Sequence, residues 1–205
     1  SKYVSNFGDG DVEIYSAPGR SEIGGNHTDH QHGEVLAASI NNDAIAIVKP
    51  LDEPVVKVIS QGYDPITVNL EHIEMLPEEK GTTASLIKGV LYKTAQMGYT
   101  IGGFQAYIAS DVLIGAGLSS SAAYETLIGT IISGIYNDMK MSPVEIAIIG
   151  QYAENVYFGK PCGLMDQMAS SVGSLVNIDF EDVKNPIIKK VDVDFGKFLH
   201  SLCIV

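Results

Sequence analysis

The sequence carries little positive charge. Among its 205 residues, 13 are lysine or arginine and 25 are aspartate or glutamate, so the formal net charge is −12. Nucleic-acid binders and polybasic membrane adaptors both need a cationic face, and this balance argues against both function classes. Arg20 is the one arginine in the chain. We therefore expect neither a nucleic acid nor a membrane as a partner, and the composition indicates no oligomeric state.

Cysteine is also scarce, and the sequence has no long hydrophobic run. Cys162 and Cys203 are too few for a disulfide scaffold in a chain of this length, so we expect free thiols in a reducing compartment. The most apolar window, residues 127–136, has about half the length of a bilayer span. The N-terminal residues show no signal-peptide pattern. These absences predict a cytoplasmic protein.

The residues that are present predict one folded α+β domain over residues 1–205. Hydrophobic residues make up 45% and charged residues 19%, which is typical of a globular chain that buries a core. Alternating patterns predict strands at residues 12–15, 44–48, 55–59, 66–70, 103–110, 174–179, 187–193 and 200–205. Helical spacing and capping signals predict helices at residues 82–97, from the serines at 119–121 to about 136, at 142–157 and at 165–171. A polar stretch, residues 16–34, is predicted to be a long functional loop.

A glycine- and serine-rich segment precedes the second predicted helix. Gly115 and Gly117 permit backbone conformations that a side chain would exclude. Hydroxyls follow where the helix begins, at Ser119, Ser120 and Ser121. Free amides, the positive helix end and hydroxyls together suit the phosphates of a nucleotide. The alternative is structural, in which a serine caps the helix and the glycines form the turn; the segment matches neither a Walker A loop nor a Rossmann fingerprint.

Three of the five histidines lie within six residues and flank Asp29; they are His27, His30 and His32. Histidine and aspartate can ligate zinc, but the spacing differs from a His-Glu-x-x-His pair and no cluster elsewhere supplies partners. A sugar site suits the chemistry better, because carboxylate, imidazole and amide groups all bond hydroxyls. Asp29 can accept two neighbouring sugar hydroxyls at once. A hydrogen-bonded polar turn without a ligand is the third alternative.

A third segment centres on Asp166, which lies among Met165, Met168 and Ala169. A partly buried carboxylate in such a helix suits the deprotonation of a hydroxyl. The structural alternative is an acid that interacts with the helix dipole. Glu154, within a mostly apolar predicted helix, can ligate Mg²⁺ together with a serine hydroxyl and ATP phosphates, or face solvent.

These three segments, taken in their order along the chain, resemble motifs of the GHMP family of small-molecule kinases. Among these kinases, they resemble the galactokinases most closely. The resemblance rests on residues 17–20 (Ala-Pro-Gly-Arg) with 27–29 (His-Thr-Asp), on 115–123 (Gly-Ala-Gly-Leu-Ser-Ser-Ser-Ala-Ala) and on 161–167 (Pro-Cys-Gly-Leu-Met-Asp-Gln). It covers nearly the whole chain. The resemblance implies the N-terminal domain of a GHMP kinase, with a ribosomal protein S5 domain 2-like fold in which helices pack on a mixed β-sheet.

The resemblance also implies an activity, the ATP-dependent phosphorylation of the anomeric hydroxyl of D-galactose to galactose 1-phosphate with Mg²⁺. Asp166 matches the catalytic aspartate, and Arg20 matches the arginine that stabilises the phosphoryl group in flight and keeps that carboxylate ionised. The matching sugar-binding positions are Asn26, His27, Thr28, Asp29 and Gly163. The matching ATP-binding positions are Gly115, Ala116, Gly117, Leu118, Ser119, Ser120 and Ser121. Ser121 and Glu154 fall at the magnesium positions.

Several residues depart from the galactokinase pattern. Asn26 stands where glutamate is usual, so the bond from the sugar's 6-hydroxyl would be accepted by an uncharged amide. His30 stands where tyrosine is usual, Leu113 where proline is usual, and residues 21–25 keep only the last glycine. Two alternatives stay open: another GHMP sugar-1-kinase acting on N-acetylgalactosamine or arabinose, and a galactose-binding regulator without turnover. Retention of both Arg20 and Asp166 argues against the regulator.

Two features of the family have no match in this sequence. One is the family's third motif, which is rich in glycine, and the other is a further tyrosine that contacts the sugar. The chain begins with serine and ends in the strand-like run 202–205, and folded proteins seldom stop in mid-strand. We therefore expect the N-terminal domain of a longer enzyme, with the C-terminal GHMP domain absent from this chain. We expect this piece alone to turn over galactose very poorly.

Overall fold

The computed structural model describes residues 2–113, 115, 117–183, 185–193 and 197. Its strands are β1 (Glu13–Gly24), β2 (Glu34–Leu51), β3 (Val55–Ser60), β4 (Ile66–Asn69), β5 (Gly103–Ser110), β6 (Leu175–Asp179) and β7 (Ile187–Val191). Its α-helices are α1 (Lys2–Phe7), α2 (Thr83–Gln96), α3 (Ser120–Asn137), α4 (Pro143–Tyr152) and α5 (Met165–Val172). Short helical segments complete the set, η1 (Thr28–Gln31), η2 (Pro77–Glu79) and the π-helical η3 (Ala153–Phe158).

The seven strands of the described residues form one mixed sheet. Six of them follow the order β4-β3-β5-β2-β6-β7, and β1 pairs with the other edge of β2. The pair β3–β5 is parallel, and the remaining pairs are antiparallel. The long strand β2 is therefore central, with β1 along one side and β5 followed by β6 along the other. This mixed sheet with packed helices confirms the predicted fold class.

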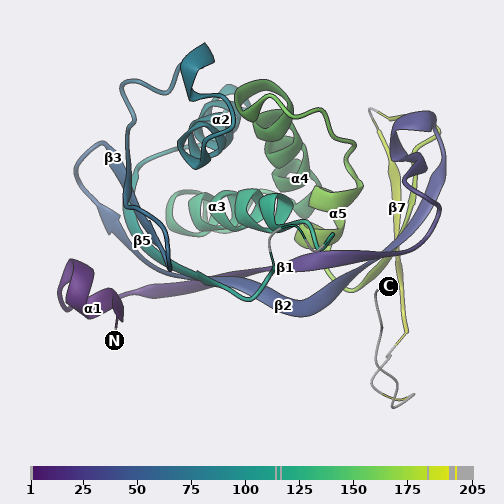
Figure 1. The fold of residues 1–205 in the computed structure, drawn as a ribbon, viewed down its shortest axis with the longest axis horizontal. Helices are drawn as coiled ribbons and strands as arrows, with labels where there is room; N and C mark the ends of the chain where they lie inside the picture. The colour runs from purple at the N-terminus through teal and green to yellow at the C-terminus, as the bar shows by residue number, and fades with distance from the viewer. Residues whose placement is uncertain (1, 114, 116, 184, 194–196, 198–205) are drawn as a thin grey trace.

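Helices α2 to α5 lie together on one face of the sheet, as Figure 1 shows. The sequence forms helix α2 because apolar residues recur on one side of it, and Leu86, Ile87, Val90 and Leu91 are all buried. The apolar side chains of α3 pack in the same core as residues of β2, β3 and β5. A second apolar cluster joins α5 to β6. Among the described helices, none has the length and apolarity needed to cross a membrane.

Most predicted elements are confirmed within one or two residues. The strands predicted at 55–59 and 66–70 form the antiparallel hairpin β3–β4, and the strand predicted at 103–110 coincides with β5. The helices predicted at 82–97 and 165–171 are α2 and α5. The predicted strand at 200–205 lies outside the described residues.

The prediction of a loop over residues 16–34 is wrong for the first half of that range. Strand β1 continues to Gly24, and β2 begins at Glu34, well before the predicted start at residue 44. Two register shifts, between Pro18 and Arg20 and between Glu22 and Gly24, allow proline and glycine within a strand that still pairs with β2. Only residues 25–33 link the two strands.

The helix predicted at 142–157 changes its winding partway along. It begins with the predicted capping box, in which Ser142 and Glu145 each accept a backbone N–H of the other. After Tyr152 the backbone becomes the π-helix η3, which ends at Gly159 with φ +83°. Short π-helical turns often occur at functional sites. Here the turn contains Glu154, which is 2% exposed.

Candidate active site

Arg20 joins the three sequence segments that were singled out. Its Nε donates to Asp166 Oδ1 at 2.6 Å, and its Nη2 donates to Asp166 Oδ2 at 2.9 Å, so the ion pair is bidentate. Its Nη1 donates to the carbonyl of Gly117 at 2.7 Å. The side chain of Arg20 is 9% exposed and that of Asp166 is 28% exposed. The pair is therefore mostly shielded from water, with the carboxylate facing the more open side.

Close backbone packing holds the arginine in this position. The N–H of Arg20 donates to the carbonyl of Leu118 at 3.1 Å, which ties β1 to the glycine- and serine-rich segment. A Cβ atom at Gly19 would lie 2.8 Å from the same carbonyl oxygen. The glycine before the arginine thus permits the approach. On the other side, Ser170 of α5 donates its hydroxyl to the carbonyl of Pro18 at 2.7 Å.

The start of helix α3 has the features of an anion site. Gly115 and Gly117 have φ of +77° and +72°, and both are exposed. Ser119 occupies the N-cap position in a left-handed conformation but does not cap the helix with its side chain. Its hydroxyl instead donates to Asp166 Oδ2 at 2.5 Å. The first backbone N–H groups of α3 therefore have no acceptor from the side chain of Ser119, which argues against the alternative that this serine only caps the helix. Ala116 lies outside the described residues.

The loop from β1 to η1 holds the predicted sugar-binding residues. Asn26 and His27 are exposed and have φ of +55° and +52°, so this turn places two consecutive non-glycine residues in the left-handed region. Glu22, which the sequence did not point to, accepts the N–H of His27 at 2.8 Å. Thr28 donates its hydroxyl to the carbonyl of Gly25 at 2.9 Å. These bonds hold a strained turn in one conformation.

Asp29 connects this turn to the third segment. It is 4% exposed, and its Oδ2 accepts the N–H of Met165 at 3.2 Å. A Cβ atom at Gly163 would lie 1.8 Å from that same oxygen. Asp29, Gly163 and Asp166 therefore lie in one small region at the start of α5. Asp29 has a second carboxylate oxygen, which His30 approaches at 3.4 Å.

The histidines do not gather around a common centre. His27 lies 3.5 Å from Glu22, His30 contacts Asp29, and His32 Nδ1 is 3.0 Å from the carbonyl of Glu181. Within the described part of the chain, no group of three or more His, Cys, Asp or Glu side chains is placed to hold a metal ion. The zinc alternative for this cluster therefore gains no support from the structure.

Ser121 and Glu154 lie together, as their predicted shared role requires. The hydroxyl of Ser121 donates to Glu154 Oε1 at 3.0 Å. The amide nitrogen of Gln167 donates to Glu154 Oε2 at 2.8 Å and to Glu125 Oε2 at 3.1 Å. Lys160 completes the group, with its Nζ 3.3 Å from Glu154 Oε1. The sequence did not point to Glu125, Gln167 or Lys160, because side chains of these types in a helix or loop are ordinary surface residues.

Glu125 is 1% exposed, and burial followed by the nearby charge of Glu154 raises its carboxyl pKa well above the ordinary value of 4.5. Above pH 4.5, Glu125 therefore keeps its proton in the folded protein but has released it in the unfolded chain. The contribution of Glu125 to the free energy of unfolding is largest below pH 4.5. It is lost as the pH rises through the pKa that this carboxyl has in the folded state.

Replacing Glu125 with glutamine removes this dependence and keeps an oxygen that can accept from Gln167. We expect Glu125→Gln to raise the free energy of unfolding at pH 8, because the raised pKa of the buried carboxyl lowers the stability of the wild type at that pH and the neutral amide does not titrate. At pH 4 we expect no difference. Urea unfolding at both pH values measures this, with the exposed Glu71→Gln as a control for the loss of one charge. A difference that is independent of pH would contradict the assignment.

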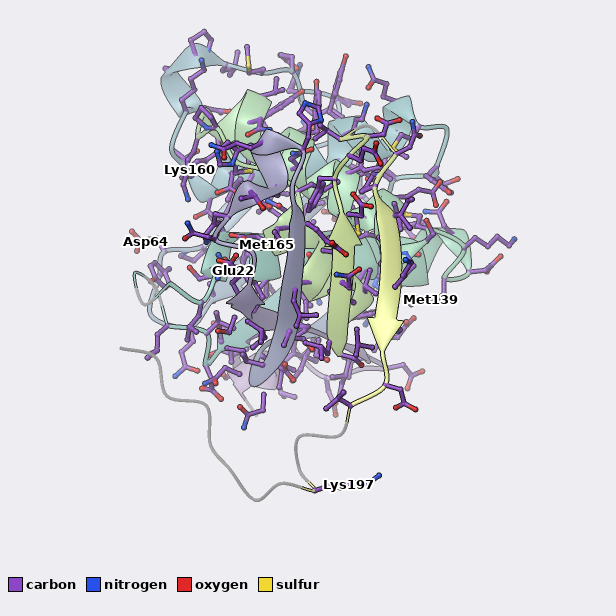
Figure 2. The ribbon with its side chains drawn as sticks, turned by 90° about the vertical axis from the view of Figure 1, so that its right-hand side faces the viewer. Glu22, Asp64, Met139, Lys160, Met165 and Lys197 are labelled. Atoms are coloured by element: carbon purple, nitrogen blue, oxygen red, sulfur yellow. The ribbon has the colours of Figure 1, made fainter. Side chains whose placement is uncertain are left out.

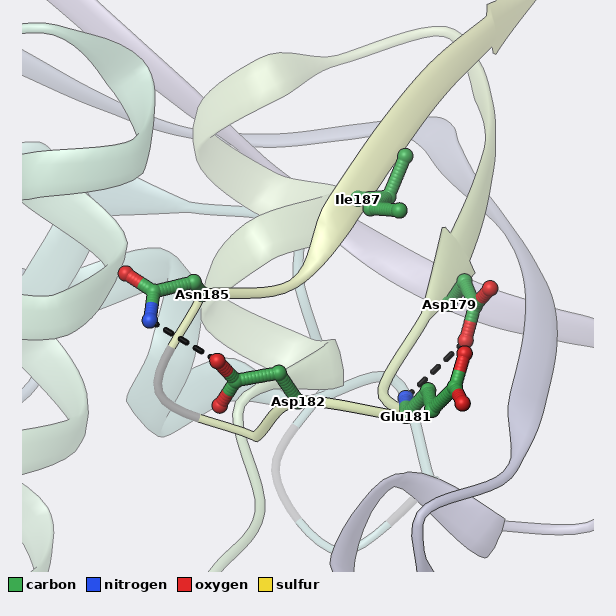
Figure 3. A pocket seen from close by; sticks show the side chains of 5 residues that line it. All are labelled: Asp179, Glu181, Asp182, Asn185 and Ile187. Atoms are coloured by element: carbon green, nitrogen blue, oxygen red, sulfur yellow. Dashed lines mark hydrogen bonds between the residues drawn. The ribbon is translucent and has the colours of Figure 1, made fainter.

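A separate cavity of about 270 Å³ lies at the turn between β6 and β7. Its lining side chains, shown in Figure 3, are Asp179, Glu181, Asp182, Asn185 and Ile187. Three of the polar side chains form bonds within the turn, since Asn185 donates to Asp182 at 2.9 Å and Asp179 accepts the N–H of Glu181 at 2.9 Å. None of the lining residues belongs to the three segments, so we do not include this cavity in the site.

Two protein-family models match parts of this chain. The galactokinase galactose-binding signature matches residues 1–50, and the GHMP kinases N terminal domain matches residues 85–174. The galactokinase of Clostridium tetani is 31% identical over 202 residues, covering 98% of this chain and 51% of that protein. The galactokinase of Pyrococcus furiosus is 34% identical over 169 residues, covering 82% of this chain and 46% of that protein.

A solved structure shows the same arrangement of the backbone. The crystal structure of Lactococcus lactis galactokinase complexed with galactose superposes with a TM-score of 0.84 at 27% identity, covering 94% of this chain and 51% of that chain. Residues 85–174 therefore match the N-terminal domain of the GHMP kinase family, and the chain shares the fold of these kinases. Within the family, its similarity is to galactokinases. The chain spans about half the length of the curated relatives it matches.

Proposed function

We propose that the complete protein transfers the γ-phosphoryl group of ATP to the anomeric hydroxyl of D-galactose, giving galactose 1-phosphate and ADP. The observation that carries this proposal is the bidentate pair of Arg20 and Asp166, which lies between the sugar-binding turn and the glycine- and serine-rich segment. The likeness to a galactokinase solved with galactose supports galactose as the sugar. The name of each curated relative supports the same reaction.

In the proposed reaction, Asp166 accepts the proton of the anomeric hydroxyl while that oxygen attacks the γ-phosphorus of ATP. Arg20 holds the carboxylate through both oxygens and brings a positive charge to the side where the phosphoryl group passes. The hydroxyl of Ser119 adds a third bond to the carboxylate. Asp29 orients the sugar through its hydroxyls, and the amides at the start of α3 bind the phosphates.

Ser121 and Glu154 fit a magnesium site. A hydroxyl and one buried carboxylate are hard oxygen ligands, and Mg²⁺ usually takes one or two carboxylates together with substrate phosphates. When bound, the ion would neutralise charge on the ATP phosphates. We also propose that residues 1–205 form the N-terminal domain, that a C-terminal GHMP domain outside this sequence completes the nucleotide site, and that the protein is cytoplasmic.

A sugar panel tests the proposed substrate. We expect galactose-dependent release of ADP by the complete protein, with kcat/KM for galactose at least about tenfold above that for N-acetylgalactosamine or arabinose. Asn26 is the residue that favours the second candidate, another sugar-1-kinase, because it replaces the usual glutamate in an exposed, strained turn. A higher kcat/KM for one of those sugars would establish that candidate. Tight binding of galactose without any turnover would instead identify a regulator.

A further inference from the structure

Lys160 contacts Glu154 through both its backbone and its side chain. It follows Gly159, the left-handed residue that ends η3, and its N–H donates to the carbonyl of Glu154 at 3.0 Å. Its Nζ donates to Glu154 Oε1 at 3.3 Å. The side chain of Lys160 is 63% exposed, whereas that of Glu154 is 3% exposed. Figure 2 shows Lys160 toward the edge of the molecule, outside the buried Met165.

The other bonds to Glu154 come from neutral groups. Ser121 donates a hydroxyl to Oε1, and Gln167 donates an amide N–H to Oε2. Glu125, which accepts from the same nitrogen of Gln167, is a second buried acid. Lys160 is thus the contact of Glu154 that brings positive charge and also reaches solvent.

The ammonium of Lys160 occupies the place that a divalent cation would take on Glu154. It lies on Oε1, the same oxygen that accepts the hydroxyl of Ser121, and those two side chains are the proposed cation ligands. A divalent cation on that oxygen and an ammonium about 3 Å away would repel each other strongly in a partly buried site. The flexible stem of a lysine that is mostly exposed allows the ammonium to move away into solvent.

We propose that Lys160 is the resident counter-ion of Glu154 and gives up that position when a divalent cation binds. The inference rests on the proposed function, since it takes Ser121 and Glu154 as the cation's ligands. The proposal predicts that Lys160 weakens the binding of the divalent cation, because the ammonium must first be displaced from Glu154.

Replacing Lys160 with methionine keeps much of the side chain's length and removes the competing charge. We expect Lys160→Met to bind Mn²⁺, used alone as the probe, about tenfold more tightly than the wild type. Electron paramagnetic resonance of free Mn²⁺ during a titration measures this in the complete protein. Lys57→Met is the matched control, because its ammonium forms an exposed ion pair with Glu53 at 3.2 Å on β3 and its loss changes the net charge equally.

The possible outcomes separate the inference from the proposed function. Tighter binding in Lys160→Met, unchanged binding in Lys57→Met, and loss of binding in the double variant Lys160→Met with Glu154→Gln support the inference. Binding that depends on Glu154 but is equal or weaker in Lys160→Met refutes the role of the lysine alone. Absence of saturable Mn²⁺ binding in every form, or binding that survives Glu154→Gln, refutes the proposed cation ligands as well. Lys160→Gln, with the melting temperature measured for each variant, repeats the test with a second neutral side chain.

Discussion

Replacing Asp166 with asparagine is expected to lower kcat by about a thousandfold or more while the Kd for galactose changes by less than about threefold. Asparagine keeps the size of the side chain, and its carbonyl can still accept from Arg20 or Ser119. It cannot take a proton from the sugar. The structure places the carboxylate in contact with both groups and with 28% of its surface exposed, which leaves room for an incoming hydroxyl. Sugar binding by calorimetry and turnover by ADP release measure the two effects separately.

The control for this variant is Asp138→Asn. Asp138 is an exposed residue that follows α3, and its carboxylate contacts Lys140 at 3.1 Å, so the same chemical change there should leave kcat and Kd unaltered. If Asp166→Asn retained more than about a tenth of wild-type turnover, general-base contributions of the usual size would be excluded. A parallel loss of galactose affinity would show instead that Asp166 serves to shape the sugar site.

Replacing Gly163 with alanine is expected to weaken galactose binding by at least about tenfold and to lower the free energy of unfolding by about 1–3 kcal/mol. The added methyl group would lie 1.8 Å from Asp29 Oδ2 and 2.4 Å from its Cγ. Asp29 is buried and bonded to the N–H of Met165, so the carboxylate must lose that bond to escape the overlap. The displaced oxygens would no longer be in place for the proposed bonds to the sugar hydroxyls. Calorimetric titration with galactose and urea unfolding measure the two effects.

Gly24→Ala is the control for an added methyl group close to the same turn. A Cβ atom at Gly24 would meet no other atom within 4 Å, and its φ does not lie in the left-handed region. We expect this variant to bind galactose as the wild type does. Unchanged affinity in Gly163→Ala would mean that Asp29 does not hold the sugar, since the substitution cannot leave that carboxylate in place.

Local patterns predicted most of the regular structure. Alternation and turn residues located the hairpin β3–β4, and apolar spacing located α2, because these signals depend on neighbouring residues alone. The same reasoning failed for β1, whose polar residues, proline and glycines read as a loop. Its strand conformation comes from pairing with β2 over its whole length, with bulges that local composition does not reveal.

From the residues alone, the site could be predicted only as separate segments. Arg20 and Asp166 are 146 residues apart in the sequence, and the resemblance to a family, rather than any spacing, predicted that they would meet. The bond from Ser119 to Asp166 and the network around Gln167 were not predicted at all. Buried polar contacts of this kind depend on how α3, η3 and α5 pack, and a polar residue in a helix gives no sign of it.

The position of the transferred phosphoryl group tests the central claim most directly. If Arg20 and Asp166 act between the sugar and ATP as proposed, ³¹P and ¹H nuclear magnetic resonance of the reaction with galactose will show one product, phosphorylated on the anomeric oxygen. The signal will depend on galactose and will be absent with Asp166→Asn. Phosphate on another hydroxyl, or anomeric phosphorylation that persists in Asp166→Asn, would contradict the account.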